Sequence, residues 1–212
     1  MSTPTFDAPF RETLNDLLAW RRDVRHFKTD PVDRDIVLDC LKTVSIGPSV
    51  GNSQPWRFVL VDDQNRLQKL TELFEATNAE ALSDFAGDSA KLYATLKLAG
   101  LKEAPIQLSV FADIHTNVGR GLGSRTMPET KAYSVVGAIH TLWILLRAHG
   151  IGMGWVSILP PDAMAELMEV DPTYKFIGHL CIGYPQEQTL TPELVKAGWQ
   201  DRLPFDEFII ER

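Results

Sequence analysis

Four charged residues within five positions form the part of the chain best suited to chemistry. Arg21, Arg22 and Arg25 surround Asp23, and a guanidinium group can bind two phosphate oxygens through parallel hydrogen bonds. The cluster therefore fits a clamp for one anion, and it fits equally well a set of cations that stabilises the C-terminus of a preceding helix. Asp23 should stay ionised among the arginines, and local charge compensation is its simplest role.

Two further polar residues are candidates for the same site. Arg202 lies far along the chain, in an Asp-Arg-Leu-Pro sequence, and could converge with the arginine cluster on one phosphate, although by itself it is typical of a surface arginine. Ser157 lies in an apolar stretch, Trp155–Leu159, that predicts a strand. A buried hydroxyl needs a hydrogen-bond partner, which is either a backbone carbonyl or a bound ligand.

A turn-rich stretch, residues 47–55, places short hydrogen-bonding side chains beside glycine. Ser49, Asn52, Ser53 and Gln54 would let the chain approach the edge of a flat ligand, and ordinary turn polarity explains them equally well. The stretch also contains Gly-Pro-Ser-Val-Gly, which matches the nucleophile elbow of hydrolases. That motif needs a strand before the serine and a helix after it, and here the order is reversed. We therefore reject a serine hydrolase.

Two other chemistries are excluded by residue spacing. The glycine-dense segments 119–123 and 150–154 lack the Gly-x-Gly-x-x-Gly pattern that binds dinucleotides between a strand and a helix. The five histidines show neither His-x-His nor His-Glu-x-x-His spacing, so no metal site is predicted. His140 and His149 lie on an apolar helix and are expected to be surface or hydrogen-bonded histidines.

The composition bounds the class of protein. With 212 residues, 44% of them hydrophobic, residues 1–212 are expected to form a single domain. A net charge of -7 excludes non-specific nucleic-acid binding. No apolar run approaches the roughly 20 residues that span a bilayer, and the first ten residues do not resemble a signal peptide. Cys40 and Cys181 form no Cys-x-x-Cys pair, which favours a reducing cytoplasmic setting.

Helical and strand periodicities both occur along the chain and indicate a mixed α and β protein. Apolar residues at helical spacing predict helices near 10–20, 36–44 and 67–74, with Asp33 as the N-cap of the second. The tail is expected to add a last strand at 208–210. Short apolar runs predict the other strands at 58–61, 106–112, 155–159 and 176–184.

Three longer segments are expected to surround this framework. The most apolar helix, Tyr133–His149, is followed by Gly150 as its cap and needs burial on several sides, in the core or against a second subunit. Residues 75–104 are helix-prone but more polar, are broken at Gly87, and are expected to lie over the rest of the protein. Residues 113–130 form a loop long enough to indicate function or mobility.

Several motifs occur in the order seen in the nitroreductase-like FMN flavoproteins, and the chain resembles that family from about Leu14 to Ile209. Within the family it is similar to the BluB group of 5,6-dimethylbenzimidazole synthases. Its most specific feature is Asp23, where most nitroreductases carry serine, combined with a Trp-Val-Ser strand. The motifs are Arg21–Arg25, Pro48–Gly51 with Gln54–Trp56, Leu96–Leu98 before Ala104-Pro105, Gly152–Ile158, and Gly198-Trp199 with Arg202–Pro204.

The resemblance implies a three-layer α+β fold, with a mostly antiparallel central sheet flanked by helices, and an intertwined homodimer with two FMN sites at the subunit interface. The arginines would hold the phosphate and the ribityl chain. Residues 75–104 would form a lid that excludes bulk solvent. The residues expected to contact FMN are Arg21, Arg22, Asp23, Val24, Arg25, Leu98, Ser157 and Arg202, with Pro48, Ser49 and Gly51 reaching across from the other subunit.

The resemblance also implies an activity in which the flavin is substrate as well as ligand. Reduced FMN would react with O2 and be fragmented to 5,6-dimethylbenzimidazole, the lower ligand of cobalamin, with D-erythrose 4-phosphate as co-product. Asp23 is expected to act as acid and base near the ribityl carbons, and Ser157 to hydrogen-bond near the ring. A closed lid would leave little room for a nicotinamide, so a separate flavin reductase is expected to supply the reduced FMN.

An ordinary NAD(P)H-dependent FMN nitroreductase, which retains its flavin and stacks a second substrate on it, is the main alternative. Asp23 together with Ser157, and the long lid, favour the synthase. A non-catalytic flavin-binding protein is a third hypothesis, and no feature of the sequence favours it.

Overall fold

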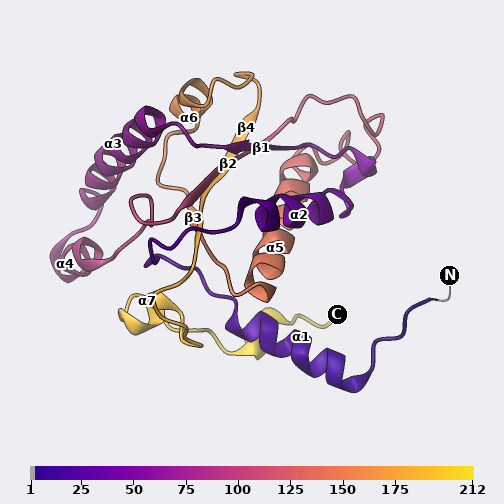
Figure 1. Ribbon diagram of the computed structural model, residues 1–212, viewed down its shortest axis with the longest axis horizontal. Coiled ribbons are helices and arrows are strands. Elements are labelled where there is room, and N and C mark those ends of the chain that lie inside the picture. Colours follow the sequence, from indigo (N-terminus) through magenta and orange to yellow (C-terminus); the bar gives the residue numbers. More distant parts are fainter. Residues whose placement is uncertain (1–2) are drawn as a thin grey trace.

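A four-stranded antiparallel sheet forms the centre of the protein (Figure 1). The structure is a computed structural model that describes residues 3–212. Each neighbouring pair of strands in the order β1-β2-β4-β3 is antiparallel, as the family resemblance led us to expect. The strands are β1 (Trp56–Leu60), β2 (Ile106–Ala112), β3 (Gly152–Val156) and β4 (Lys175–Gly183).

Helices cover both faces of the sheet, which gives the expected three layers (Figure 1). Helices α2 and α5 pack with Leu108 and Leu180 on one face, whereas α3 and α6 pack with Phe111 and Cys181 on the other. Successive side chains of a strand point to opposite faces, so the two cores take different residues from the same strands. The helices are α1 (Ala8–Trp20), α2 (Arg34–Ser45), α3 (Gln64–Leu82), α4 (Gly87–Thr95), α5 (Thr130–Ala148), α6 (Pro161–Leu167) and α7 (Glu193–Lys196), with 3-10 turns at Val50–Asn52 and Phe205–Phe208.

Helix α5 has the predicted position and the predicted cap. Gly150 adopts φ +73°, and the N–H groups of Gly150 and Ile151 donate to the carbonyls of Arg147 and Leu146 at 2.9 and 3.0 Å. This pair of bonds is the Schellman pattern that satisfies the last carbonyls of a helix. One side of α5 is buried in the core, while Tyr133 remains exposed on the other side, so a second subunit could still cover part of it.

The first helix and the C-terminal tail leave apolar side chains exposed. Helix α1 buries none of its residues in this chain, although Phe10, Leu14 and Leu18 follow the predicted helical spacing. The predicted strand at 208–210 is wrong, because a strand needs a hydrogen-bonded neighbour and the four-stranded sheet does not pair with the tail. Exposed apolar surface of this extent is typical of a protein interface.

Several predicted boundaries differ from the structure. The third strand begins at Gly152 and ends at Val156, three residues earlier than predicted at both ends. Helix α3 extends without a break to Leu82, so it includes the first part of the expected lid, and Gly87 begins α4 as the predicted break between helices. None of the helices within residues 3–212 is long and apolar enough to cross a membrane.

A chain of three polar side chains is buried between β2 and β4. Gln107 donates from its amide nitrogen to the carbonyls of Leu101 and Ala104, at 3.1 and 3.0 Å, so its Oε1 is left to accept from His179 Nε2 at 2.8 Å. The proton of His179 therefore lies on Nε2, and Nδ1 accepts from the Ser109 hydroxyl at 2.8 Å. Every member of this network has a partner, which is the condition for burying polar groups without a large cost.

The network predicts a pH dependence of stability. Burial lowers the pKa of His179 from 6.5 to about 3. Between these values the unfolded chain binds a proton that the folded chain excludes, so stability falls as the pH drops below about 6.5. We expect this histidine to lower the free energy of unfolding by about 1.4 kcal/mol per pH unit in that window and to have no effect above it.

Urea denaturation between pH 4.5 and 7.5 measures this dependence. His179→Gln should flatten the slope, whereas the exposed His140→Gln should leave it unchanged. An equal slope in His179→Gln and the natural chain would contradict the assignment.

Candidate functional site

The segment that carries the charged cluster lies along strand β3. The N–H of Val24 donates to the carbonyl of Met153 at 3.1 Å, and Asp23 forms a parallel bridge with the same residue. Such a close approach requires glycine in the strand, because a Cβ added at Gly154 would lie 2.1 Å from the Val24 carbonyl oxygen. Gly152 has the same role, with a Cβ only 2.8 Å from the Val24 side chain. This function of the two glycines was not predicted from the sequence, although glycine in a strand often signals a close backbone approach.

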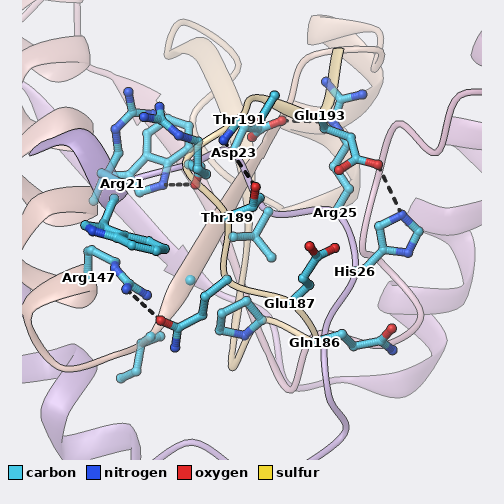
Figure 2. Close-up of a pocket in the computed structure, with 18 of the residues that line it drawn as sticks. Arg21, Asp23, Arg25, His26, Arg147, Gln186, Glu187, Thr189, Thr191 and Glu193 are labelled. Atoms are coloured by element: carbon cyan, nitrogen blue, oxygen red, sulfur yellow. Dashed lines mark hydrogen bonds and ion pairs between the residues drawn. The ribbon is translucent and has the colours of Figure 1, made fainter. Parts of the chain in front are cut away.

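The cluster opens into a polar cavity of about 300 Å³. Figure 2 shows Arg21, Asp23, Arg25 and Arg147 among the side chains around it. Five lysines and arginines line the cavity against three aspartates and glutamates, although the chain as a whole carries a net charge of -7. The cavity is therefore a local cationic site in an acidic protein. Its lining charges are Arg21, Arg22, Arg25, Arg147 and Lys196 with Asp23, Glu187 and Glu193.

The two interpretations of the arginine cluster apply to different residues. Arg22 donates from Nη2 to the carbonyl of Ala19, in the last turn of α1, and from Nε to Leu190 O at 2.9 Å. It therefore stabilises the helix C-terminus, as one interpretation predicts. Arg21 instead lies 4.7 Å above the ring of Trp143 and faces the cavity, where its guanidinium can bind an anion.

Arg202 approaches this cluster from the C-terminal tail. Burial lowers the pKa of Arg21 and of Arg22, and repulsion by Arg202 lowers both further, which places the third guanidinium within electrostatic range. The charge of Asp23 has the opposite effect on Arg21. Arginines that repel one another are stabilised by a bound anion, and Arg202, which is exposed and does not itself line the cavity, stays a candidate for the same phosphate.

Both carboxylate oxygens of Asp23 are held by the protein. Oδ1 accepts the backbone N–H of Trp155 at 3.0 Å, and Oδ2 pairs with Arg25 Nε at 2.9 Å. Arg25 also donates to the carbonyl of Lys97 at 3.1 Å. Asp23, Val24, Arg25 and Leu98 consequently line one narrow space beside β3. The charge of Asp23 is thus oriented by two elements that lie far apart in the sequence.

Ser157 does not have the burial that we predicted. Strand β3 ends at Val156, and Ser157 is the first residue beyond it and is exposed. The predicted strand began at Trp155, so it carried the serine into the core. In the sequence Ser157 follows two residues after Trp155, whose N–H binds Asp23, and it does not line the arginine cavity.

Pro48, Ser49 and Gly51 lie away from the arginine cavity. Pro48 and Ser49 line a separate open cavity of about 530 Å³ beside α5, and Gly51, at φ +57°, packs against the backbone of the 113–130 loop. The Ser49 hydroxyl accepts the N–H of Gln54 at 3.0 Å, which leaves its proton for a ligand. One chain therefore does not bring these residues to the arginines.

Several residues of the arginine cavity were missed by the sequence analysis. Apart from His26, they come from α5 and from the segment after β4, which has no strong motif of its own. His26 contributes to the same cavity and lies 3.6 Å from Glu193. Within residues 3–212 no cluster of three or more metal-binding side chains occurs, and His140 and His149 are exposed. The missed lining residues are His26, Arg147, Gln186, Glu187, Gln188, Thr189, Thr191, Glu193 and Lys196.

Comparisons with known proteins agree with this architecture. The family model of the nitroreductase family matches residues 18–184. The 5,6-dimethylbenzimidazole synthase of Rhodospirillum rubrum is 50% identical over 201 residues, which cover 95% of each chain. A BluB-like flavoprotein from Clostridium difficile 630 has a TM-score of 0.69 at 19% identity, covering 94% of this chain and 98% of its own. An iodotyrosine deiodinase bound to FMN and 3-iodo-L-tyrosine has a TM-score of 0.69 at 24% identity, covering 83% and 91%.

The chain therefore belongs to the nitroreductase family. Its place within that family follows from sequence rather than from fold, because solved structures of several activities share the fold at low identity. The chain groups with the 5,6-dimethylbenzimidazole synthases, since the Rhodospirillum rubrum enzyme is half identical to it over nearly the whole of both chains.

The arginine site predicts a dependence on phosphate. FMN and riboflavin share the ring and the ribityl chain and differ by one phosphate group. Arg202→Gln should weaken FMN binding roughly ten- to hundredfold, the value of one charge-assisted hydrogen bond, and leave riboflavin binding unchanged. Fluorescence titration with both flavins measures the effect.

Arg34→Gln is a matched control, because Arg34 is exposed on α2 and pairs with Asp62 at 2.6 Å, away from the cavity. Equal losses of FMN and riboflavin affinity in Arg202→Gln would remove Arg202 from the phosphate site.

Proposed function

We propose that this chain is a 5,6-dimethylbenzimidazole synthase that uses reduced FMN and O2 and releases D-erythrose 4-phosphate. The observation that supports it best is the carboxylate of Asp23, which is held by the Trp155 N–H and by Arg25 beside the arginine cavity. An acid and base fixed in this way suits proton transfer at a ribityl chain whose phosphate is anchored nearby.

The residues present fit FMN. The cationic cavity offers several guanidinium groups for a phosphate, and the glycines of β3 let the binding segment lie directly against the sheet. Leu98 lies beside Asp23 and Arg25, which also line the arginine cavity, so an apolar side chain adjoins the charged groups there. When bound, reduced FMN supplies the ring that reacts with O2, and it is consumed in the reaction.

Each proposed site residue then has a defined task. Arg21 and Arg202 bind the phosphate, and Arg22 fixes the end of α1 from which the cluster extends. Arg25 orients Asp23, which transfers protons at the ribityl carbons. Ser157 donates a hydrogen bond to the ring from the end of β3. Val24 and Leu98 contact the flavin through their apolar atoms.

A homodimer completes the site in this proposal. Pro48, Ser49 and Gly51 reach the ring from the second subunit, since within one chain Pro48 and Ser49 line a separate cavity and Gly51 packs against the 113–130 loop. The exposed apolar residues of α1 and of the C-terminal tail supply surface for the interface. The chain acts as a single domain of residues 1–212.

The proposed lid is residues 75–104, and its two ends differ in how firmly they are held. The carbonyls of Lys97, Leu101 and Ala104 accept hydrogen bonds from Arg25 and Gln107, so the C-terminal end is fixed to the core. Helix α4 buries only Tyr93 and is the part best able to move. The lid excludes bulk solvent from the reaction, and a separate flavin reductase delivers the reduced FMN.

A reducing, cytoplasmic setting belongs to this proposal. Cys40 and Cys181 are both free and buried, and burial raises the pKa of the Cys181 thiol to about 12, so it stays protonated.

The proposal predicts that Asp23→Asn separates binding from chemistry. Asparagine keeps the size of the side chain and an oxygen for the Trp155 N–H, so FMN affinity should change by less than about tenfold. Formation of 5,6-dimethylbenzimidazole from chemically reduced FMN in air should fall by roughly a hundredfold or more, the usual contribution of a general acid and base.

The exposed Asp39→Asn on α2 is the matched control and should keep full activity. Product formation that is unchanged in Asp23→Asn would remove Asp23 from the mechanism. If the natural chain forms no dimethylbenzimidazole but oxidises NADPH rapidly, the enzyme is the flavin-retaining reductase instead.

A further inference from the structure

Three aromatic rings join helix α4 to the C-terminal tail. Phe85 lies just before α4 and Tyr93 lies within it. Their rings stack with centroids 4.7 Å apart. Trp199 meets both rings edge-on, at 5.5 Å from Phe85 and 6.1 Å from Tyr93. Tyr93 also donates its hydroxyl proton to Asn78 of α3 at 2.8 Å. We call these three rings the aromatic cluster.

Hydrogen bonds hold the backbone on the tail side of the cluster. Gly198, at φ +72°, ends α7 with a Schellman pair of bonds, from Gly198 N–H to Val195 O at 3.0 Å and from Trp199 N–H to Leu194 O at 2.9 Å. This cap fixes the direction in which the indole leaves α7. A movement of α7 would therefore move the Trp199 indole against Phe85 and Tyr93 of the lid.

The chain on either side of Trp199 carries residues of the arginine site. Glu193 and Lys196 of α7 line the cationic cavity, and Arg202, three residues beyond Trp199, acts electrostatically on Arg21 and Arg22. Figure 1 shows α7 and α4 on the same side of the molecule, and the ring contacts join the segment just after α7 to α4 and to Phe85 before it. A phosphate bound by Lys196 and Arg202 would restrain the segment between them, which carries Trp199.

We propose that Trp199 couples the phosphate site to the lid. A phosphate held by Arg202 fixes residues 193–202, and the indole then holds α4 in its closed position through Phe85 and Tyr93. Trp199 is a positioning residue in this scheme, since it acts through the aromatic cluster. The inference rests on the proposed lid function and adds what makes the lid respond to the phosphate end of the flavin.

The strength of the contacts suits a switch. Each aromatic pair contributes about 0.5–1.5 kcal/mol beyond burial, which corresponds to roughly two- to tenfold in an equilibrium. Helix α4 has little else to hold it, because Tyr93 is its only buried residue and Ala86 gives no side-chain cap at its N-terminus. A modest interaction can therefore shift α4 between open and closed positions.

Hydrogen exchange of α4 in the presence of oxidised flavins tests the coupling. In the natural chain, saturating FMN should slow amide exchange in residues 87–95 roughly two- to tenfold more than saturating riboflavin, which lacks the phosphate. In Trp199→Ala the two flavins should protect α4 equally, while FMN still binds through Arg21 and Arg202. Trp199→Phe keeps an aromatic edge and should restore part of the difference.

Two variants separate coupling from a general loss of structure. Phe85→Ala removes the lid side of the same contact and should abolish the difference between the flavins as Trp199→Ala does, with no further effect in the double variant. Ile46→Ala, at an exposed apolar residue at the end of α2, outside the aromatic cluster and the proposed interface, should leave the difference intact. If Trp199→Ala or Phe85→Ala retains the full FMN-specific protection, the coupling is wrong.

Amide exchange is measured with oxidised flavins and without turnover. The coupling and the synthase activity are therefore tested independently. Equal protection of α4 by FMN and riboflavin in the natural chain overturns the coupling and leaves the synthase assignment standing. Phosphate-specific protection in a chain that forms no dimethylbenzimidazole supports the coupling and overturns the synthase assignment.

Discussion

The candidate site depends on one backbone contact, the hydrogen bond from Val24 N–H to the carbonyl of Met153. It holds the charged segment against β3 at a distance that only glycine at 152 and 154 permits. From this contact Asp23 gains the Trp155 N–H, and Arg25 reaches the carbonyl of Lys97. A side chain at position 154 would separate the segment from the sheet and would move the arginines and the carboxylate together.

Electrostatic strain around this contact explains how an acidic protein can hold a phosphate. Arg21 and Arg22 are partly desolvated and Arg202 repels both, and these two effects lower the pKa of Arg21 and Arg22. An anion offsets this repulsion. Relief of the repulsion therefore contributes to the free energy of anion binding, because the arginines are already close together in the folded protein. The surrounding negative charge is compatible with such a site because salt screens charges that are exposed and distant.

The sequence predicted those features that local pattern controls. The apolar run at 106–112 and the Gly150 cap agree with β2 and with the end of α5. The charged cluster was recognised because its residues are adjacent in the chain. The cavity lining from the segment after β4 was missed, since tertiary contacts alone bring it to Arg21. The strand predicted at 208–210 failed for a related reason: apolar residues there had suggested pairing that one chain does not provide.

The separation of the two cavities has a genetic consequence. Asp23 lies on one and Ser49 on the other, so in the proposed dimer each active site draws one half from each chain. Two chains that are inactive for different reasons, one altered at Asp23 and the other at Gly51, would then restore each other. Their mixed dimer has one site with both defects and one with neither. Complementation between alleles would thus reveal the shared architecture without a structure of the assembly.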